Sequence, residues 1–229
     1  MKYIFKIVLL CFLTFTANAA DIPWTYIGHA NNVTAIAAAE GHFFAATRDN
    51  KLWIRNPVHS NVNWRHIGNA NNVTTMASIG NKLFAATTNN KLLVREAVDS
   101  DISWREIGHA NNVVAMTAIA NKLFAATSDN KLWMRDAVER DVNWRHIGHA
   151  NKVTAMTSVF SVLIVSTEDN VLWYRNVNTN NPSDRNWQRH GHTNNVVAMT
   201  SYGRIAEEIA LYAVSSDNKL WVRNTDIPF

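Results

Sequence analysis

The chain has 229 residues, of which 47% are apolar and 17% charged, with a formal net charge of +4 and one cysteine. This composition predicts a folded chain with a sizeable apolar core. The weak positive charge does not favour a nucleic-acid partner, and no segment after the N-terminus is apolar over the length of a membrane span. We therefore expect no nucleic-acid partner and no membrane span.

The N-terminal segment has the order of a secretory signal peptide. Lys2 and Lys6 precede the apolar run 7–15, which is followed by Ala17-Asn18-Ala19. A basic region, a short apolar region and an A-x-A site in this order are typical of a cleaved signal. A membrane anchor is the alternative, but the run is shorter than the roughly 20 residues that a spanning helix needs. We predict a signal peptide at 1–19 and a secreted or periplasmic domain at 20–229.

The one cysteine, Cys11, lies inside that predicted signal peptide. The mature chain would therefore hold no disulfide and no cysteine-ligated metal. Without Lys2 and Lys6 its formal charge falls to about +2. Such a chain must be stabilised by the packing of its core.

Five similar units then follow one another along the chain. Each continues from a tryptophan through a glycine, an Asn-Asn-Val stretch, a "KLFAAT"-like stretch, a "DNKLW"-like stretch and an arginine. The tryptophans are spaced by 40, 40, 40 and 43 residues and are Trp24, Trp64, Trp104, Trp144 and Trp187. A repeat of this length predicts a solenoid, a propeller or a similar array.

Each unit contains four short apolar stretches with the composition of strands. They lie around the tryptophan, after Asn-Asn-Val, at "KLFAAT" and at "KLWxR", and Gly, Asn and Asp separate them. Four strands in roughly 40 residues are typical of a β-propeller blade, with a β-solenoid as the alternative. The last unit lacks a tryptophan strand. We expect the strand at Trp24 to join 196–201, 209–215 and 219–223 and to close an all-β, five-bladed propeller.

Strand direction assigns the connections to two faces of this ring. An antiparallel meander places the "GHANN" connections and the "SDN" turns on one face. The Gly/Asn turns and the arginine-to-tryptophan connections fall on the other. The two insertions, after Arg175 and after Met199, lie on this second face, whereas the loops of the first face keep their length. Loops normally tolerate changes in length, so we predict a repeated binding site on the first face.

The Asn pairs and histidines of the "GHANN" connection each have two interpretations. Asn is a turn residue, but its amide also suits sugar hydroxyls. The histidines could ring the pore as metal ligands, although a hydrogen-bonding position in a loop is the favoured interpretation, and we expect no metal and no cofactor. The candidates are His29, Asn31, Asn32, His109, Asn111, Asn112, His149, Asn151, His192, Asn194 and Asn195.

The "DNKLWxR" stretch supplies the other half of the predicted site. Its tryptophan is either core or a platform for a sugar ring. Its arginine, two residues later, shares a strand face with the tryptophan and either binds ligand or packs its stem on an aromatic ring. The first tryptophan of each unit is predicted to be structural. The candidates are Asp49, Asn50, Trp53, Arg55, Asp129, Asn130, Trp133, Arg135, Asp169, Asn170, Trp173, Arg175, Asp217, Asn218, Trp221 and Arg223.

The order Trp-x-x-Ile-Gly, Val-x-Ala, Leu-Phe-Ala and Asp-Asn-x-Leu-Trp-x-Arg resembles tectonin-type repeats, and the five units resemble tachylectin-like propeller lectins. The resemblance covers nearly all of the predicted mature chain. It implies several equivalent pockets that bind glycans or glycoconjugates. WD repeats are a weaker likeness, because Ile, Met, Tyr and Val stand where their aspartate would follow the late tryptophan.

No set of residues predicts catalysis. The acids are scattered, and no serine, histidine and aspartate come with a nucleophile turn. The sequence therefore predicts a lectin rather than an enzyme, with a protein-interaction scaffold as the alternative and a metal-dependent hydrolase as a third class. Unit two is expected to bind poorly, because Asn69, Asn89 and Leu93 replace the His, Asp and Trp of the other units.

Overall fold

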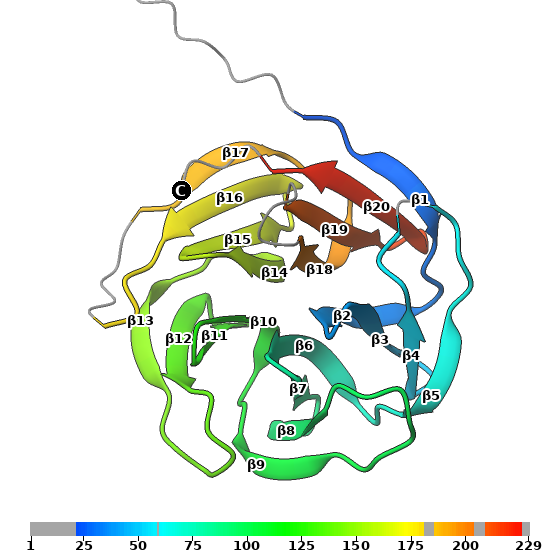
Figure 1. Cartoon of the computed structure of the whole chain (residues 1–229). Coiled ribbons are helices and arrows are strands. Elements are labelled where there is room, and N and C mark those ends of the chain that lie inside the picture. The colour runs from blue at the N-terminus through cyan, green and yellow to red at the C-terminus, as the bar shows by residue number, and fades with distance from the viewer. Residues whose placement is uncertain (1–21, 59, 181–185, 204–208, 226–229) are drawn as a thin grey trace, which may run out of the picture.

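The computed structural model describes residues 22–58, 60–180, 186–203 and 209–225. Five four-stranded antiparallel sheets stand around a central axis, as Figure 1 shows. The chain is thus an all-β, five-bladed propeller, and the predicted fold class is confirmed. The predicted signal peptide, and parts of both insertions, lie outside the described residues.

Each blade runs from an inner to an outer strand. Blade 1 contains β2 (Val33–Ala39), β3 (His42–Thr47), β4 (Lys51–Arg55) and β5 (Arg65–Asn69). Blade 2 contains β6 (Val73–Ile79), β7 (Lys82–Thr87), β8 (Lys91–Glu96) and β9 (Arg105–His109). Blade 3 contains β10 (Val113–Ile119), β11 (Lys122–Thr127), β12 (Lys131–Asp136) and β13 (Arg145–His149).

The remaining two blades repeat this order and complete the ring. Blade 4 contains β14 (Val153–Val159), β15 (Val162–Thr167), β16 (Val171–Asn176) and β17 (Gln188–His192). Blade 5 contains β18 (Val196–Tyr202), β19 (Ala210–Ser215), β20 (Lys219–Asn224) and β1 (Thr25–His29). Because β1 pairs with β20, the first strand of the chain closes the last blade as the sequence predicted (Figure 1).

The middle strands of a blade are apolar on both faces because both faces are covered. In β3, Phe43 and Phe44 point to opposite faces and are fully buried. The core is divided into five clusters, each made of residues from two adjacent blades. The stability of the fold therefore depends on contacts between blades, which explains the near-continuous apolar character of these strands.

The glycine of the repeated "GHANN" connection lies at a β-bulge of the outer strand. In β1 the register shifts between Tyr26 and Gly28, and Gly28 has φ +136°. A Cβ at Gly28 would lie 2.5 Å from Oδ1 of Asn61, on the connection in the neighbouring blade. Only glycine combines this backbone conformation with so close a neighbour.

The second residue of each Asn pair is a turn residue that is bound to the preceding blade. Asn32 has φ 56°, and its backbone N–H donates to Oδ1 of Asn218 at 2.8 Å. Asn218 itself has φ 64°, and its carbonyl accepts from the N–H of Ala30. The same latch joins every pair of neighbouring blades, with amides from Asn50, Asn90, Asn130, Asn170 and Asn218. Lys152 takes the turn position in blade 4, which shows that the backbone rather than the side chain is required there.

The latch predicts different costs for two substitutions of Asn90. Asn90→Gly keeps the left-handed backbone but removes the amide that holds the N–H of Asn112, so we expect a loss of about 1 kcal/mol in the free energy of unfolding. Asn90→Ala adds strain at φ 64° and is expected to lose roughly a further 1 kcal/mol. Chemical denaturation of both variants measures this difference. Equal stability of both variants and the parent would contradict the latch.

Candidate functional site between adjacent blades

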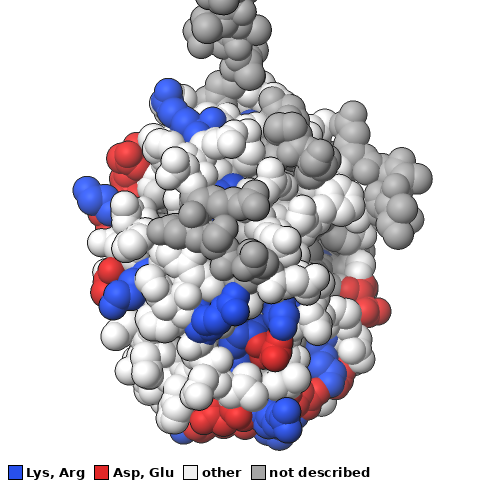
Figure 2. Space-filling model, turned by 90° about the vertical axis from the view of Figure 1, so that its left-hand side faces the viewer, with Lys and Arg blue, Asp and Glu red and all other residues white. Residues whose placement is uncertain are grey.

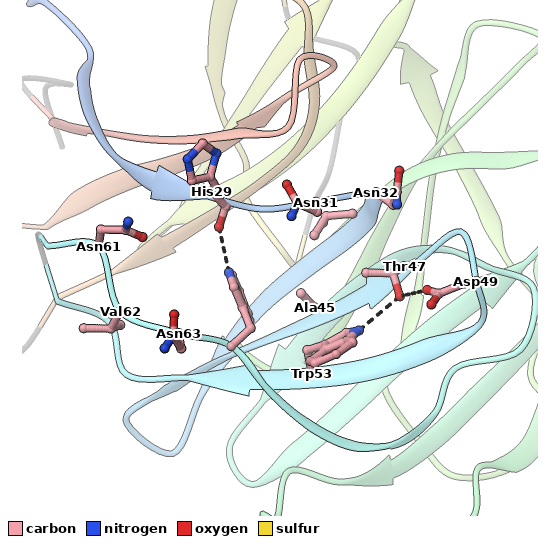
Figure 3. Close-up of a pocket in the computed structure, with 12 residues that line it drawn as sticks. His29, Asn31, Asn32, Ala45, Thr47, Asp49, Trp53, Asn61, Val62 and Asn63 are labelled. Atoms are coloured by element: carbon pink, nitrogen blue, oxygen red, sulfur yellow. Dashed lines mark hydrogen bonds between the residues drawn. The ribbon is translucent and has the colours of Figure 1, made fainter.

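A pocket opens between blades 5 and 1, on the side where the "GHANN" connection crosses from one blade to the next. Its cavity volume is about 580 Å³. In Figure 3, His29, Asn31 and Asn32 lie on the connection above Thr47, Asp49 and Trp53, and Asn61, Val62 and Asn63 form a further side. The "GHANN" connection and the "SDN" turn therefore face one cavity.

Equivalent pockets occur in blades 3 and 4, each of about 230 Å³. The blade 3 pocket is lined by the connection of His109, Asn111 and Asn112 and by Asp129 and Trp133. In blade 4, Asn151, Lys152, Asp169 and Trp173 line the pocket. Structure thus brings together the first Asn of each of these connections and the Asp and Trp of the following hairpin.

A short hydrogen-bond relay fixes the tryptophan of "LW" within the pocket. The indole N–H of Trp53 donates to Oγ1 of Thr47 at 3.2 Å, and the Thr47 hydroxyl lies 2.5 Å from Oδ1 of Asp49 (Figure 3). With its N–H engaged at one edge, the half-buried indole ring keeps a fixed orientation. The same relay joins Trp133, Thr127 and Asp129 in blade 3 and Trp221, Ser215 and Asp217 in blade 5.

The aspartates of these relays remain charged. In blade 3 the Lys131 ammonium, 2.6 Å from Oδ2 of Asp129, and then the Thr127 hydroxyl lower the pKa of Asp129 below its ordinary value. Hydrogen bonds from Thr47 and then Lys51 lower the pKa of Asp49 in the same direction. A carboxylate that stays ionised is a hydrogen-bond acceptor at the pocket edge throughout the neutral range.

The first tryptophan of the unit, which the sequence predicts to be structural, also forms a second aromatic wall of the pocket. Trp64 lines the blade 1 pocket, and Trp144 and Trp187 line those of blades 3 and 4. The indole N–H of Trp64 donates to the carbonyl of His29 at 2.9 Å. The same bond occurs at all five junctions, from Trp24, Trp64, Trp104, Trp144 and Trp187.

This wall corrects the assignment of loops to two separate faces. The outer strands follow one another around the perimeter, so the end of β1 at His29 meets the start of β5 after Trp64 (Figure 1). Twist of the blades therefore brings the last residues of the arginine-to-tryptophan connection, Asn61–Trp64, beside the "GHANN" connection. A meander drawn flat from the sequence omits this rotation.

The four arginines predicted in the pockets, Arg55, Arg135, Arg175 and Arg223, lie behind them instead, and so does Arg95 of unit two. Arg55 is only 3% exposed, and its guanidinium lies 5.4 Å from the ring centroid of Trp64. It donates to the carbonyls of Asn56, Val58 and Ser60 in the connection that leads to that tryptophan. Arg55, Arg95, Arg135, Arg175 and Arg223 all have this position against the next first tryptophan. The cause is the length of the side chain, which spans from the strand to the loop carbonyls that it satisfies.

The structure places the other candidates in three groups. Asn50, Asn130, Asn170 and Asn218 are occupied by the latch between blades. His29 and His109 line their pockets, whereas the lining of the blade 4 pocket begins one residue after His149, at Ala150. In blade 5, His192, Asn194 and Asn195 lie on the crossover into β18, and Trp24 from the first strand approaches through its bond to His192 O. The junction of blades 4 and 5 thus depends on ring closure, which brings Trp24 to His192.

Within the described part of the chain, no group of three or more His, Cys, Asp or Glu side chains is arranged to hold a metal ion. The same part of the chain contains no helix that could cross a bilayer.

The fold and its clefts define the chain as a five-bladed β-propeller with repeated pockets between blades. No protein-family model and no curated protein matches the sequence. Among solved structures, a glutaminyl cyclase from Myxococcus xanthus is 12% identical with a TM-score of 0.61, over 90% of this chain and 96% of that one. U3-55K is 17% identical with a TM-score of 0.49, over 89% of this chain and 64% of that one. The likeness to the glutaminyl cyclase supports the propeller fold. Sequence identities this low do not indicate an activity.

Arg135→Ala tests the support behind the pocket wall. Arg135 is buried and donates to three carbonyls of the connection before Trp144. Its loss removes charge-assisted hydrogen bonds and a cation–π contact, so we expect unfolding to be easier by about 2–4 kcal/mol. Thermal and chemical denaturation measure this cost. The exposed Arg48→Ala is the control and is expected to change stability by less than about 0.5 kcal/mol; equal effects would contradict the buried role.

The lowered pKa of Asp129 gives a prediction for Lys131→Ala. Removal of the ammonium is expected to raise the pKa of Asp129 toward the ordinary value of 3.8, because its largest stabilising partner is lost. A depressed pKa stabilises the folded state at pH values above the pKa of the same group in the unfolded chain. This contribution is lost as the pH falls through the pKa of the folded state. Titration of the carboxyl ¹³C shift measures the change, with Lys122→Ala as the control. An unchanged titration would show that Lys131 does not govern Asp129.

Proposed function

We propose that the protein is a secreted carbohydrate-binding protein, similar to tectonin-type propeller lectins, with several related sugar pockets around its ring. The observation that supports this function is the pocket with two tryptophans and two polar loops, repeated between blades. Aromatic rings pack against the CH face of a pyranose, and amide, imidazole and carboxylate groups match its hydroxyls. The signal peptide at 1–19 remains a prediction that accompanies this proposal.

The dimensions of the pockets in blades 3 and 4 favour one small ring per site. Cavities of about 230 Å³ in blades 3 and 4 lie below the roughly 300–1,000 Å³ of drug-sized sites. A single shallow pocket binds a monosaccharide weakly. Several pockets on one rigid ring raise the avidity for a dense glycan surface by a factor of about 10²–10⁴ when they are engaged together.

Blade 2 is the proposed defective member. Leu93 replaces the tryptophan of "LW" and pairs across the sheet with Glu106. The Glu106 carboxylate forms an ion pair with Lys91 at 2.6 Å, and Asn89 replaces the relay aspartate. This blade keeps Trp104 but lacks the second indole, so a sugar ring would have only one of the two aromatic walls.

A glycan array on the secreted form, followed by isothermal titration with the best ligand, tests the function. We expect more than one and fewer than five sites per chain, and Trp133→Ala is expected to remove one site because it deletes a pocket wall. Leu93→Ala is the matched control, since it truncates the same position in the blade without the platform. A stoichiometry of one in the parent would contradict the repeated sites.

A protein-interaction scaffold is the second candidate. The innermost strands β2, β6, β10, β14 and β18 line a central channel. Phe160 lies at one mouth of this channel and is 65% exposed, and this exposed aromatic side chain favours a protein partner. On the side of the molecule in Figure 2, basic and acidic side chains are interspersed with uncharged surface. An empty glycan array together with a captured protein that is lost on Phe160→Ala would establish this alternative instead of the lectin.

A further inference from the structure

The pocket of blade 4 differs from its sisters at three aligned positions around one tryptophan, Trp173. Lys152 replaces the second Asn of the crossover, Val171 replaces the lysine two residues before the tryptophan, and Arg189 replaces the residue paired with the tryptophan on the outer strand. The first of these residues lines the cavity, together with Asp169 and Trp173. All three changes alter where charge lies at the pocket.

The change at Val171 releases a carboxylate oxygen. In the sister hairpins a lysine occupies Oδ2 of the turn aspartate, at 2.9 Å in Lys51–Asp49 and 2.7 Å in Lys219–Asp217. Val171 has no charge to offer. In the described part of the chain, Asp169 forms a side-chain hydrogen bond only with Thr167, through Oδ1 at 2.5 Å. Its second oxygen is therefore available to a donor on a ligand.

The change at Lys152 places a lysine among the residues that line the cavity. The backbone N–H of Lys152 is fixed by Oδ1 of Asn130 at 2.8 Å, so the residue is held at the pocket edge. Glu168 is its neighbour through the backbone, with an N–H···O distance of 2.9 Å. Nevertheless, no carboxylate among the described residues lies within ion-pair distance of the Lys152 ammonium. The sister pockets of blades 1 and 3 have the neutral Asn32 and Asn112 at this place.

The change at Arg189 adds a second cation beside the platform. Arg189 pairs directly with Trp173 across the sheet, so the two side chains share a face. In blades 1 and 3 the equivalent neighbours are His66 and His146, whose rings contact Trp53 and Trp133. Arg189 contacts Nε2 of His192 at 2.7 Å, a contact with an imidazole rather than with a carboxylate. Trp173, which lines the cavity with Lys152, thus has a cation as its neighbour on the outer strand.

We propose that the blade 4 pocket selects a pyranose that carries an anionic substituent, a carboxylate or a sulfate, whereas the pockets of blades 1 and 3 bind neutral rings. The ring stacks on Trp173, the anionic group lies toward Lys152 and Arg189, and Asp169 accepts from a ring hydroxyl. Among the described residues the cations here have no carboxylate partner, whereas the lysines of the sister hairpins, Lys51 and Lys131, are paired with Asp49 and Asp129, so an anion finds free charge-assisted donors only in blade 4. This inference rests on the proposed lectin function and adds a second ligand class to it.

The experiment follows the ¹⁵N indole signals of the full chain, assigned with Trp53→Phe, Trp133→Phe and Trp173→Phe. The probes are the methyl glycosides of glucose and galactose, their uronic acids and their 6-sulfates. We expect the Trp173 signal to respond to an acidic probe at about tenfold lower concentration than to its neutral parent, because a charged hydrogen bond is gained. The uronic acids and sulfates distinguish the two sources of negative charge. The Trp53 and Trp133 signals are expected to show no preference for the acidic probes.

Two variants separate pocket charge from general surface charge. Lys152→Asn restores the residue of the sister pockets and is expected to abolish the acidic preference at Trp173, whereas Lys122→Asn, which removes a distant lysine paired with Asp136, leaves it unchanged. The preference is also expected to fall as salt is added.

A neutral preference at Trp173, or a preference that survives Lys152→Asn, would overturn the inference. If neutral sugars move Trp53 and Trp133 while no acidic sugar moves Trp173, the inference fails and the lectin function stands. If no sugar moves any indole signal and a glycan array is empty, both fail.

Discussion

The arginine–tryptophan stack at each junction between blades is the contact on which the rest of the molecule depends. Arg55 extends from β4, satisfies carbonyls of the following connection and lies against Trp64. Trp64 in turn donates to His29 at the end of the neighbouring blade. One buried cation therefore fixes a loop, an aromatic wall and the joint between two blades. Its burial lowers the pKa of Arg55, yet an arginine remains protonated in proteins, so the charge persists.

The crossover between blades both holds the ring together and lines the pocket. The second Asn adopts a left-handed turn whose N–H is held by the amide of the preceding hairpin, as in Asn32 and Asn218. This latch fixes the distance between the "GHANN" connection and the "SDN" turn. The first residue of the pair, such as Asn31, is left exposed at the cavity. The equal length of both loops in every unit is thus explained by the latch itself, and the pocket is built on a connection that the ring needs anyway.

Divergence among the units is concentrated where the framework does not constrain it. The arginine, the first tryptophan and the hairpin Asn are the same in all five units because each makes a contact between or behind blades. The positions around the platform tryptophan vary, with Leu93 in blade 2 and Lys152 and Val171 in blade 4. A propeller of this kind can change one pocket while its neighbours and its core remain intact, because each pocket is formed by only two adjacent blades.

The sequence by itself determined the blade count, the four strands per blade, the closing role of the first strand and the residues of the crossover and hairpin, since these follow from a short repeat and from local turn chemistry. It could not decide the roles of the arginine and of the first tryptophan. Arg55 shares a strand face with Trp53, which made a common pocket reasonable, but the length of its side chain and the open carbonyls of the next loop draw it behind Trp64. Trp64 becomes a pocket wall only because blade twist carries the outer strands around the perimeter until the end of one meets the start of the next. Such a contact joins residues about 35 positions apart through the rotation of whole sheets, and only the tertiary structure fixes that rotation.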